Sequence, residues 1–262
     1  MTPDPILAER IARARLLADR HPHAAGVLRF YAKLVEYQRA LLDRVPGIAF
    51  DREDLANLVP AFLDWLERES PPASWASAAD LRRIAREDWR ERFSQAIAPA
   101  GAEADGGDSW TMFVVEALLQ PLAERQAQDG RDRDSTTNEY EKSTGRCPAC
   151  RDLPVVGVLR EEGHGARRSL VCGRCATEWA YTRLACPGCG ERQFESLPVY
   201  TAEQFGHIRV EACDSCRRFL KTVDLTKDGL AVPLVDDLAS LSLDLWARSQ
   251  GYERLRPNLL RL

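Results

Sequence analysis

Apolar residues recur at helical spacing through most of the first 128 residues. Five such stripes predict five helices, because positions three and four apart share one helix face. The first runs from about Pro5 to Ala18. The other four stripes are Val27, Phe30, Tyr31, Leu34, Val35, Leu41 and Leu42; Leu55, Leu58, Val59, Phe62, Leu63 and Leu66; Leu81, Ile84, Ala85, Trp89, Phe93, Ala96 and Ile97; and Phe113, Val114, Ala117, Leu118 and Leu122. We therefore expect residues 1–128 to form a helical bundle domain.

Polar residues and prolines mark the ends and bends of these helices. Asp51, Asp80 and Ser109 are the expected N-caps, because short polar side chains accept hydrogen bonds from the free N–H groups of a first turn. Pro60 lies inside one stripe and should kink that helix, since proline removes a backbone donor.

The aromatic residues divide into core and surface candidates. Trp65 and Trp89 fall among leucines at helical spacing, so we expect them in the core. Trp75 lies in a proline-containing loop and is the better candidate for a surface aromatic. Trp179 and Tyr181 sit in a short strand-like run, where core packing is favoured over contact with a partner.

The pattern changes after the helical part. Charged residues dominate residues 129–146, which we expect to be a polar linker because little there can be buried. Short apolar runs typical of strands follow at 155–159, 169–171, 178–181, 197–200 and 208–210. Residues 234–262 resume a helical pattern, with Gly251 placed as a C-cap glycine and an expected apolar face of Leu238, Leu241, Leu245 and Trp246.

All eight cysteines lie in this second part, in four C-x-x-C pairs. They are Cys147/Cys150, Cys172/Cys175, Cys186/Cys189 and Cys213/Cys216, separated by gaps of 21, 10 and 23 residues. Two intervening residues let both thiolates of a pair point into one tetrahedron. Sequential pairing predicts two four-cysteine metal modules, over residues 147–183 and 184–233. The expected architecture is α+β: a helical bundle, two small rubredoxin-like or zinc-ribbon-like modules, and a C-terminal helix.

Two other uses of these cysteines are disfavoured. Structural disulfides suit small secreted domains, whereas the N-terminal residues lack the pattern of a signal peptide, so we expect a cytoplasmic protein. A redox dithiol usually occurs singly on a βαβ scaffold. His164 and His207 could in principle replace a cysteine, but with eight thiolates available a turn or surface role is favoured. Tetrahedral sulfur suits zinc and iron equally, and the spacing does not separate them.

Charge and motif content limit the functional classes. The formal charge is −4, and residues 147–216 contain eight arginines, no lysine and nine acidic residues, which disfavours nucleic-acid binding. No apolar stretch is long enough to span a membrane. The phosphate-binding loop, the dinucleotide fingerprint, the H-E-x-x-H pair and the nucleophile elbow are all missing. All-cysteine ligation leaves no open metal position, so we expect no catalytic residues and no enzyme activity.

Several segments together resemble the formate dehydrogenase accessory protein family (FdhE-type). The resemblance is carried by the helical first half, the four C-x-x-C pairs, the run from Val171 to Tyr181 before Cys186, and the tail from Asp236 to Leu241 followed by Gly251 and Asn258. It spans the whole chain and is most specific from Cys147 onward.

The resemblance implies a role in maturation. Members act in the cytoplasm on respiratory formate dehydrogenases and are needed for active enzyme to form. Their paired cysteines are regarded as rubredoxin-like iron sites that contact the catalytic subunit, so iron is favoured here and zinc remains possible. Two alternatives stay open: an iron-based electron-transfer or redox-sensing protein, and a zinc-ribbon nucleic-acid binder, which the charge count disfavours.

Overall fold

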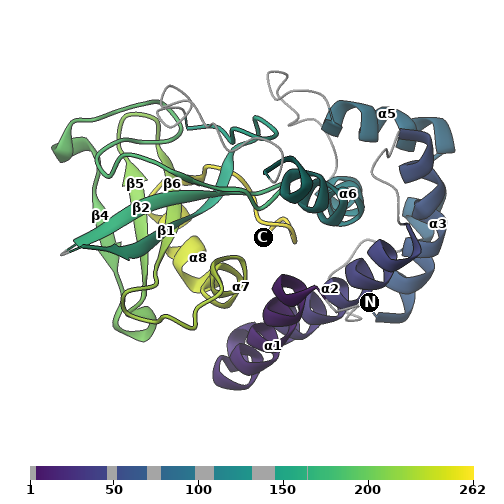
Figure 1. Ribbon diagram of the computed structural model, residues 1–262, viewed down its shortest axis with the longest axis horizontal. Helices are drawn as coiled ribbons and strands as arrows, with labels where there is room; N and C mark the ends of the chain where they lie inside the picture. Colours follow the sequence, from purple (N-terminus) through teal and green to yellow (C-terminus); the bar gives the residue numbers. More distant parts are fainter. Residues whose placement is uncertain (1–3, 46–51, 70–77, 98–108, 132–144, 164) are drawn as a thin grey trace.

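The computed structural model describes residues 4–45, 52–69, 78–97, 109–131, 145–163 and 165–262. A helical half and a β-rich half lie side by side, with the C-terminus between them (Figure 1). The helical half consists of α1 (Pro5–Arg20), α2 (Ala25–Arg44), α3 (Arg52–Glu69), α4 (Ala78–Arg82), α5 (Arg86–Ile97) and α6 (Ser109–Arg131). The β-rich half consists of β1 (Pro154–Glu162), β2 (Gly165–Cys172), β3 (Glu178–Ala180), β4 (Val199–Thr201), β5 (Ile208–Cys213), β6 (Arg218–Asp224), α7 (Pro233–Ala239), α8 (Leu241–Ser249) and β7 (Glu253–Arg254). The expected α+β class is confirmed.

Four of the five predicted helices are confirmed as α1, α2, α3 and α6. Their apolar stripes meet in one core, in which Leu34, Phe62 and Phe113 are completely buried. Asp4 begins α1, since its Oδ1 accepts a hydrogen bond of 2.9 Å from the N–H of Ile6. The bundle therefore forms for the reason that the stripes predicted, which is burial of one face of each helix.

The predicted helix from Leu81 to Ile97 is wrong in one respect, because it is broken into α4 and α5. The N–H groups of Arg83 and Ile84 donate to carbonyls three residues back, which closes α4 with a tight 3₁₀-type end. Asp80, the expected cap, lies inside α4 instead and pairs with Arg83 at 3.0 Å. The apolar spacing continues across the break, so periodicity alone does not show it.

Trp65, Trp89 and Trp179 follow the prediction. Trp89 is buried, and Trp65 stacks on Phe62 with a ring separation of 5.5 Å against the same core. Trp179 and Tyr181 are buried in the β-rich half. The predictions for Asp51, Trp75, His164, the side chain of Ser109 and residues 132–144 lie outside the described parts.

The strands join into one seven-stranded sheet in the order β3-β2-β1-β6-β5-β4, with β7 beside β6. β1 pairs antiparallel with β2, and β5 pairs antiparallel with β6, so each four-cysteine segment supplies one hairpin. β1 and β6 pair in parallel, with Val156 opposite Lys221 and Val158 opposite Val223. This parallel contact joins the two segments into one sheet, which is more stable than isolated hairpins of this size.

The apolar pattern did not predict β6, although β6 is a central strand. A lysine interrupts its apolar run, and Lys221 is 0% exposed. Its Nζ donates to the carbonyl of Asp237 at 2.7 Å and pairs with the carboxylate of Asp244. In a sequence, a lysine normally indicates a surface position. A lysine that is buried with its charge paired therefore cannot be recognised before the fold is known, and the strand that carries it is missed.

The expected single C-terminal helix is also wrong, since α7 and α8 are separate. Ser240 lies between them, and its hydroxyl donates to the carbonyls of Asp236 and Asp237 within 3.1 Å. These bonds, with the one from Lys221, occupy the carbonyls that a continuing helix would use.

The expected apolar face of that helix is wrong for the same reason. Leu238 is buried, whereas Leu245 and Trp246 lie at the surface. Gly251 is confirmed as the C-terminal glycine of α8, because its φ is +79° and the N–H of Tyr252 donates to the carbonyl of Ala247 at 3.1 Å.

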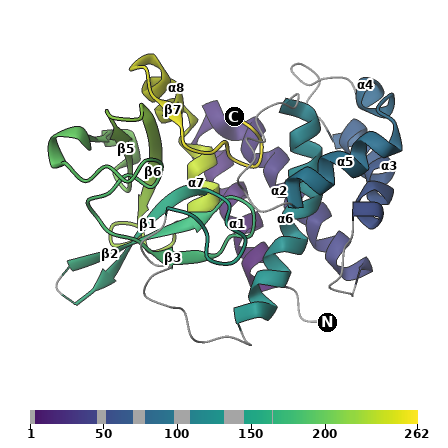
Figure 2. The same cartoon turned by 90° about the horizontal axis from the view of Figure 1, so that it is seen from above.

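The sequence left open whether the tail packs on the bundle or on the metal segment, and α7 packs on both. It contacts α1 and α2 on one side and β1 and β6 on the other (Figure 2). Arg13 of α1 reaches Asp236 of α7 with hydrogen bonds of 3.0 and 2.5 Å between buried side chains. The tail therefore holds the two halves together. No helix in the described part of the chain is long and apolar enough to cross a membrane.

Candidate metal centres

The sulfurs of the first two C-x-x-C pairs converge into a cluster that we call the first centre. Cys147 Sγ lies 3.5 Å from Cys175 Sγ, and Cys150 Sγ lies 3.3 Å from Cys172 Sγ. All four sulfurs are within 4.8 Å of one another. The β1–β2 hairpin makes this possible, because Pro154 at the start of β1 is opposite Cys172 at the end of β2.

The other two pairs form the second centre in the same manner. Cys186 Sγ lies 3.7 Å from Cys216 Sγ, and Cys189 Sγ lies 3.6 Å from Cys213 Sγ. These four sulfurs are also within 4.8 Å of one another. The turn between β5 and β6 carries the last pair, and the loop before β4 brings the preceding pair to it. The pairing is thus sequential, as the order of the cysteines predicted.

The backbone turns the same way after each pair. Gly190 has a φ of +80°, as expected for a left-handed position after a second cysteine. Arg151, Ala176 and Arg217 occupy the corresponding positions and are also left-handed, with φ of 64°, 50° and 55°. A left-handed non-glycine residue costs about 1–2 kcal/mol, so three of the four turns accept strain to aim their sulfurs inward.

Backbone hydrogen bonds close these turns and reach the sulfurs. The N–H of Cys147 donates to the carbonyl of Asp152 at 2.9 Å, and the N–H of Cys186 donates to that of Glu191 at 2.8 Å. Within the turns, the N–H of Arg174 lies 3.4 Å from Cys172 Sγ and that of Gly188 lies 3.3 Å from Cys186 Sγ. Such N–H groups stabilise negative charge on sulfur, which metal-bound cysteine carries.

Crowding of the thiols shifts their proton affinities in opposite directions. The pKa of Cys147 is lowered because the other three thiols of the first centre hydrogen-bond to its thiolate. The pKa of Cys172 is raised, first by its contacts with Cys147 and Cys150. In the second centre, burial raises the pKa of Cys186 to about 11. Four thiolates this close need a bound cation to be charged together.

The geometry fits a tetrahedral ion. Four sulfurs bound at about 2.3 Å from one ion are about 3.8 Å apart. Two sulfur pairs in each centre are 3.3–3.7 Å apart, and all four sulfurs of a centre lie within 4.8 Å of one another. The eight cysteines are free thiols, which goes against the disulfide alternative. With sulfur in all four positions, each centre could hold zinc or iron and would have no place for a reactive water.

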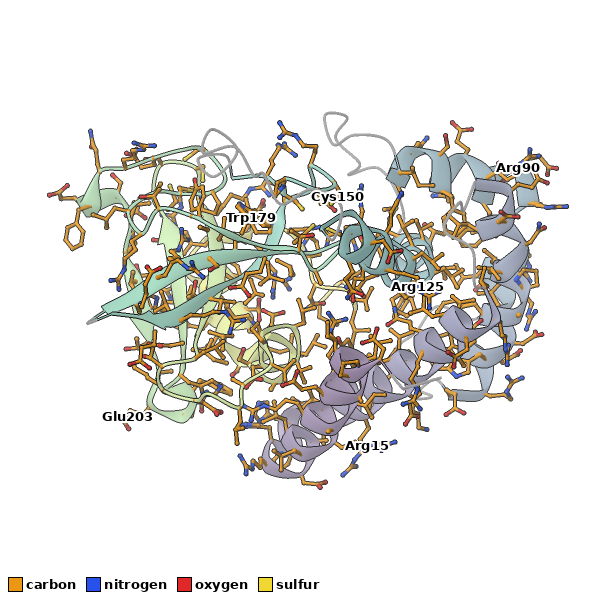
Figure 3. The ribbon with its side chains drawn as sticks, in the orientation of Figure 1. Arg15, Arg90, Arg125, Cys150, Trp179 and Glu203 are labelled. Carbon is orange, nitrogen blue, oxygen red and sulfur yellow. The ribbon has the colours of Figure 1, made fainter. Side chains whose placement is uncertain are left out.

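The centres differ in their surroundings. The first centre packs against Ala123 and Ala127 of α6, and Cys150 lies beside that helix (Figure 3). In the second centre Cys189 is exposed and Cys216 is half-buried. The first centre is thus enclosed between the sheet and the helical half, whereas the second opens to solvent.

A third cluster contains His207, Asp228 and Asp236, close enough together to share an ion. Arg13 already lies among them, with Nη2 at 2.7 Å from Asp228 and 2.5 Å from Asp236. His207 Nε2 is 2.9 Å from the same Asp236 carboxylate. The guanidinium supplies the cation, so this is an ion-pair network joining α1 to α7. Among the described residues, no histidine belongs to either cysteine centre.

Sequence reasoning missed the charged residues that support the first centre. Arg256 donates to the Asp152 carboxylate at 3.0 Å and to that of Glu116 on α6 at 3.2 Å. Burial alone would raise the pKa of Asp152, but the charges of Arg256 and Arg174 outweigh it and lower the pKa. No sequence motif marks these contacts, because Arg256 lies more than a hundred residues along the chain from both Asp152 and Glu116.

Known proteins share this architecture over nearly their whole length. A protein named FdhE homolog from Pseudomonas aeruginosa is 32% identical over 97% of this chain and 89% of that protein. This chain belongs to the FdhE family. The crystal structure of the FdhE protein from Pseudomonas aeruginosa matches with a TM-score of 0.71 and 30% identity, over 97% of this chain and 95% of that one.

The FdhE family models match the parts that carry the centres. The FdhE central domain matches residues 146–183, which contain the first centre, and the FdhE C-terminal domain matches residues 184–261, which contain the second. A distant FdhE homolog from Aquifex aeolicus is 25% identical over 95% of this chain and 93% of that protein. The family resemblance drawn from the cysteine pairs and the tail is therefore confirmed.

Proposed function

We propose that this FdhE-family chain is a maturation factor for a respiratory formate dehydrogenase. It docks on the catalytic subunit of that enzyme in the cytoplasm and is needed for the active enzyme to form. Two metal ions, each held by four cysteines, stabilise the β-rich half that takes part in docking. The chain performs no catalysis itself.

One observation carries this proposal: the eight cysteines form two closed four-sulfur centres within a chain that matches FdhE proteins from end to end. A closed centre shapes the protein around it, because metal binding free energy becomes folding free energy. It offers no position at which a substrate could bind the ion. Such centres suit a protein that acts by binding another protein.

We favour iron over zinc, from the family resemblance. The ligands would be Cys147, Cys150, Cys172 and Cys175 in the first centre, and Cys186, Cys189, Cys213 and Cys216 in the second. Elemental analysis of protein purified without oxygen decides the metal. A coloured protein with two irons per chain is the expected result, whereas a colourless protein with two zinc ions would make both centres purely structural.

The exposure of Cys189 favours a second candidate, an electron-transfer or redox-sensing role. An iron with one exposed sulfur ligand can exchange electrons with a partner at the protein surface. Reversible bleaching of visible absorbance on reduction, at a potential near that of a cellular partner, would support this role. Absence of any reducible metal would remove it.

The docking proposal is tested by capturing the purified catalytic subunit on immobilised protein. We expect capture by the metal-loaded chain and its loss after Cys147→Ser/Cys172→Ser, which opens the first centre. Arg15→Ala is the matched control, because this exposed residue lies on α1 in the helical half, well away from Cys150 of the first centre (Figure 3). Capture that survives removal of both metals would contradict a metal-dependent interface.

A further inference from the structure

A cavity of about 400 Å³ lies beside the second centre. Cys186 and Pro187 form part of one wall, and Ala212 and Phe219, from β5 and β6, line it as well. Cys213, another ligand candidate of the second centre, also lines it. The volume lies within the range of pockets that bind small molecules or side chains, about 300–1,000 Å³.

Large apolar side chains surround this cavity while remaining accessible to solvent. Leu184 is 54% exposed, Phe194 is 70% exposed and Val199 is 53% exposed, and all three line the cavity. Isolated exposed apolar residues are common, but several around one concave site mark a binding surface. The cavity therefore has an apolar interior and an apolar rim.

The charged residues that line the cavity are unbalanced. They are four arginines, Arg168, Arg183, Arg209 and Arg218, and one acid, Glu211. Glu211 is already engaged, with its carboxylate 2.6 Å from Arg168 and 2.5 Å from Arg209. Burial alone would raise the pKa of Glu211, but these two guanidiniums outweigh it and lower the pKa, so the acid is ionised. Its charge is thus already shared by two of the arginines.

The other two arginines have little or no pairing. Within the described part of the chain Arg183 has no ion-pair partner, and Arg218 has only a contact of 3.9 Å with the exposed Glu253. An exposed pair at that distance is worth little. Both guanidiniums are available to a carboxylate, which they can bind with two parallel hydrogen bonds. The cavity is complementary to an apolar group beside negative charge.

We propose that this cavity binds a segment of the client protein in which an aliphatic or aromatic side chain is flanked by aspartate or glutamate. The apolar side chain enters the cavity beside Phe194, and the flanking carboxylates pair with Arg183 and Arg218. This inference rests on the proposed function, because it names the surface of the chain that meets the catalytic subunit.

A peptide fits these observations better than a nucleic acid. The cavity is concave and apolar, whereas a nucleic-acid surface needs a row of positive charge that follows a phosphate backbone. The chain as a whole has a formal charge of −4, which opposes that. An apolar side chain with a neighbouring carboxylate matches both the apolar lining of the cavity and its available arginines.

The position of Cys186 and Cys213 links this site to the metal. Both residues line the cavity and both belong to the second centre. Without an ion the four thiols of that centre lose the constraint that fixes the Cys186–Pro187 wall. Client binding through the cavity should therefore require a metal-loaded second centre.

The test uses the full chain, metal-loaded, and the purified formate dehydrogenase catalytic subunit, with affinity measured by biolayer interferometry. Arg183→Glu/Arg218→Glu and, separately, Phe194→Asp should each weaken binding at least tenfold, about 1.4 kcal/mol. Arg20→Glu/Arg44→Glu is the matched control, because it reverses two exposed arginines at the ends of α1 and α2. Metal content and melting temperature establish that each variant is folded.

A second arm identifies the bound segment with short overlapping peptides that tile the catalytic subunit. The bound peptides should share an apolar residue flanked by acids and should lose binding when those acids become lysines. If the wild-type chain binds the subunit and both cavity variants bind it equally well, the cavity inference fails and the proposed function stands. If the wild-type chain does not bind the subunit at all, the proposed function fails. An oligouridine that binds more tightly than any peptide, and is lost in the same variants, would also overturn the inference.

Discussion

The guanidinium of Arg256 lies directly over Gly173, within the second turn of the first centre. A Cβ at position 173 would be 2.3 Å from Nη1 of Arg256 and 2.6 Å from its Cδ. From this place Arg256 reaches Asp152 beside the first turn and Glu116 on α6. The missing side chain at Gly173 thus allows the tail, the first centre and the helical half to meet at one guanidinium.

Gly173→Ala should therefore destabilise the protein strongly. The methyl group displaces Arg256 from Asp152 and Glu116, while Arg174 still lies 3.2 Å from Asp152, so we expect a loss of about 1–3 kcal/mol. Urea unfolding of the metal-loaded protein measures the change. Gly26→Ala is the control, because nothing lies within 4 Å of its Cβ position on α2. The control should be neutral or stabilise by about 0.5–1 kcal/mol, and equal losses in the two variants would contradict the role of Arg256.

The joint between α1 and α7 gives a second prediction. Arg13→Ala leaves the carboxylate of Asp236 buried with its main cationic partner removed, and we expect a loss of about 3–5 kcal/mol. Arg15→Ala, two residues along the same helix, breaks only an exposed pair with Glu36 and should cost less than about 1 kcal/mol. Thermal unfolding compares the two variants. If Arg15→Ala lowered stability as much as Arg13→Ala, the loss would come from α1 itself and not from its ion pairs with α7.

Acid sensitivity should depend on Asp237. This carboxyl is fully buried, which alone would raise its pKa, but Arg254 at 2.5 Å and Lys221 at 3.2 Å outweigh burial and lower the pKa. A lowered folded-state pKa means that this group stabilises the protein above its unfolded pKa of about 3.9. The contribution is then lost as the pH falls through the folded-state value.

Asp237→Asn tests this account. The variant should be less stable at neutral pH by about 3–5 kcal/mol, because Lys221 and Arg254 lose a charged partner. It should also lose less further stability than the wild type between about pH 6 and pH 3. Urea unfolding at several pH values gives both quantities. Acid releases metal from both proteins alike, so parallel acid curves for the two would rule out a contribution from Asp237.

Metal removal should proceed in two phases. The second centre, with its exposed Cys189, should lose its ion to a chelator before the first centre, which is enclosed against α6. A coloured chelator follows release over time. Cys189→Ser should abolish the fast phase and leave the slow phase in place, with only moderate loss of stability. Cys147→Ser should remove the slow phase and lower the melting temperature much more, since Cys147 is completely buried. Simultaneous release of both ions would show that the centres are coupled.

Helices α1, α2, α3 and α6 and the eight cysteine ligand candidates could be predicted from residue spacing alone. The helices depend on contacts within a short stretch of chain, and the C-x-x-C spacing marks the cysteines as ligands. Gly251 belongs here too, because a left-handed residue after a helix is a local requirement. These features follow from the order of residues without knowledge of what packs against them. Sequential division into two centres is one of three divisions that four pairs allow, and the fold selects it.

Long-range contacts decided the features that spacing did not predict. The central strand β6 was not predicted, because Lys221 interrupts its apolar run. The charge of this lysine is neutralised by acids from α7 and α8, which are distant in sequence. The same lysine and Ser240 end α7 where the apolar pattern continued. Arg183, in the loop after β3, and Arg218, at the start of β6, line one cavity only in the folded chain.

The sequence by itself determined the helical faces and the eight candidate sulfur ligands, and it made sequential division into two centres the first expectation. Tertiary structure alone decided that both centres share one sheet, that α7 joins the halves, and that one centre is enclosed while the other borders an open cavity. The physical reason is that a metal site and an amphipathic helix are specified by positions a few residues apart. Burial of a charge, in contrast, is stable only when a partner from a distant segment arrives to neutralise it.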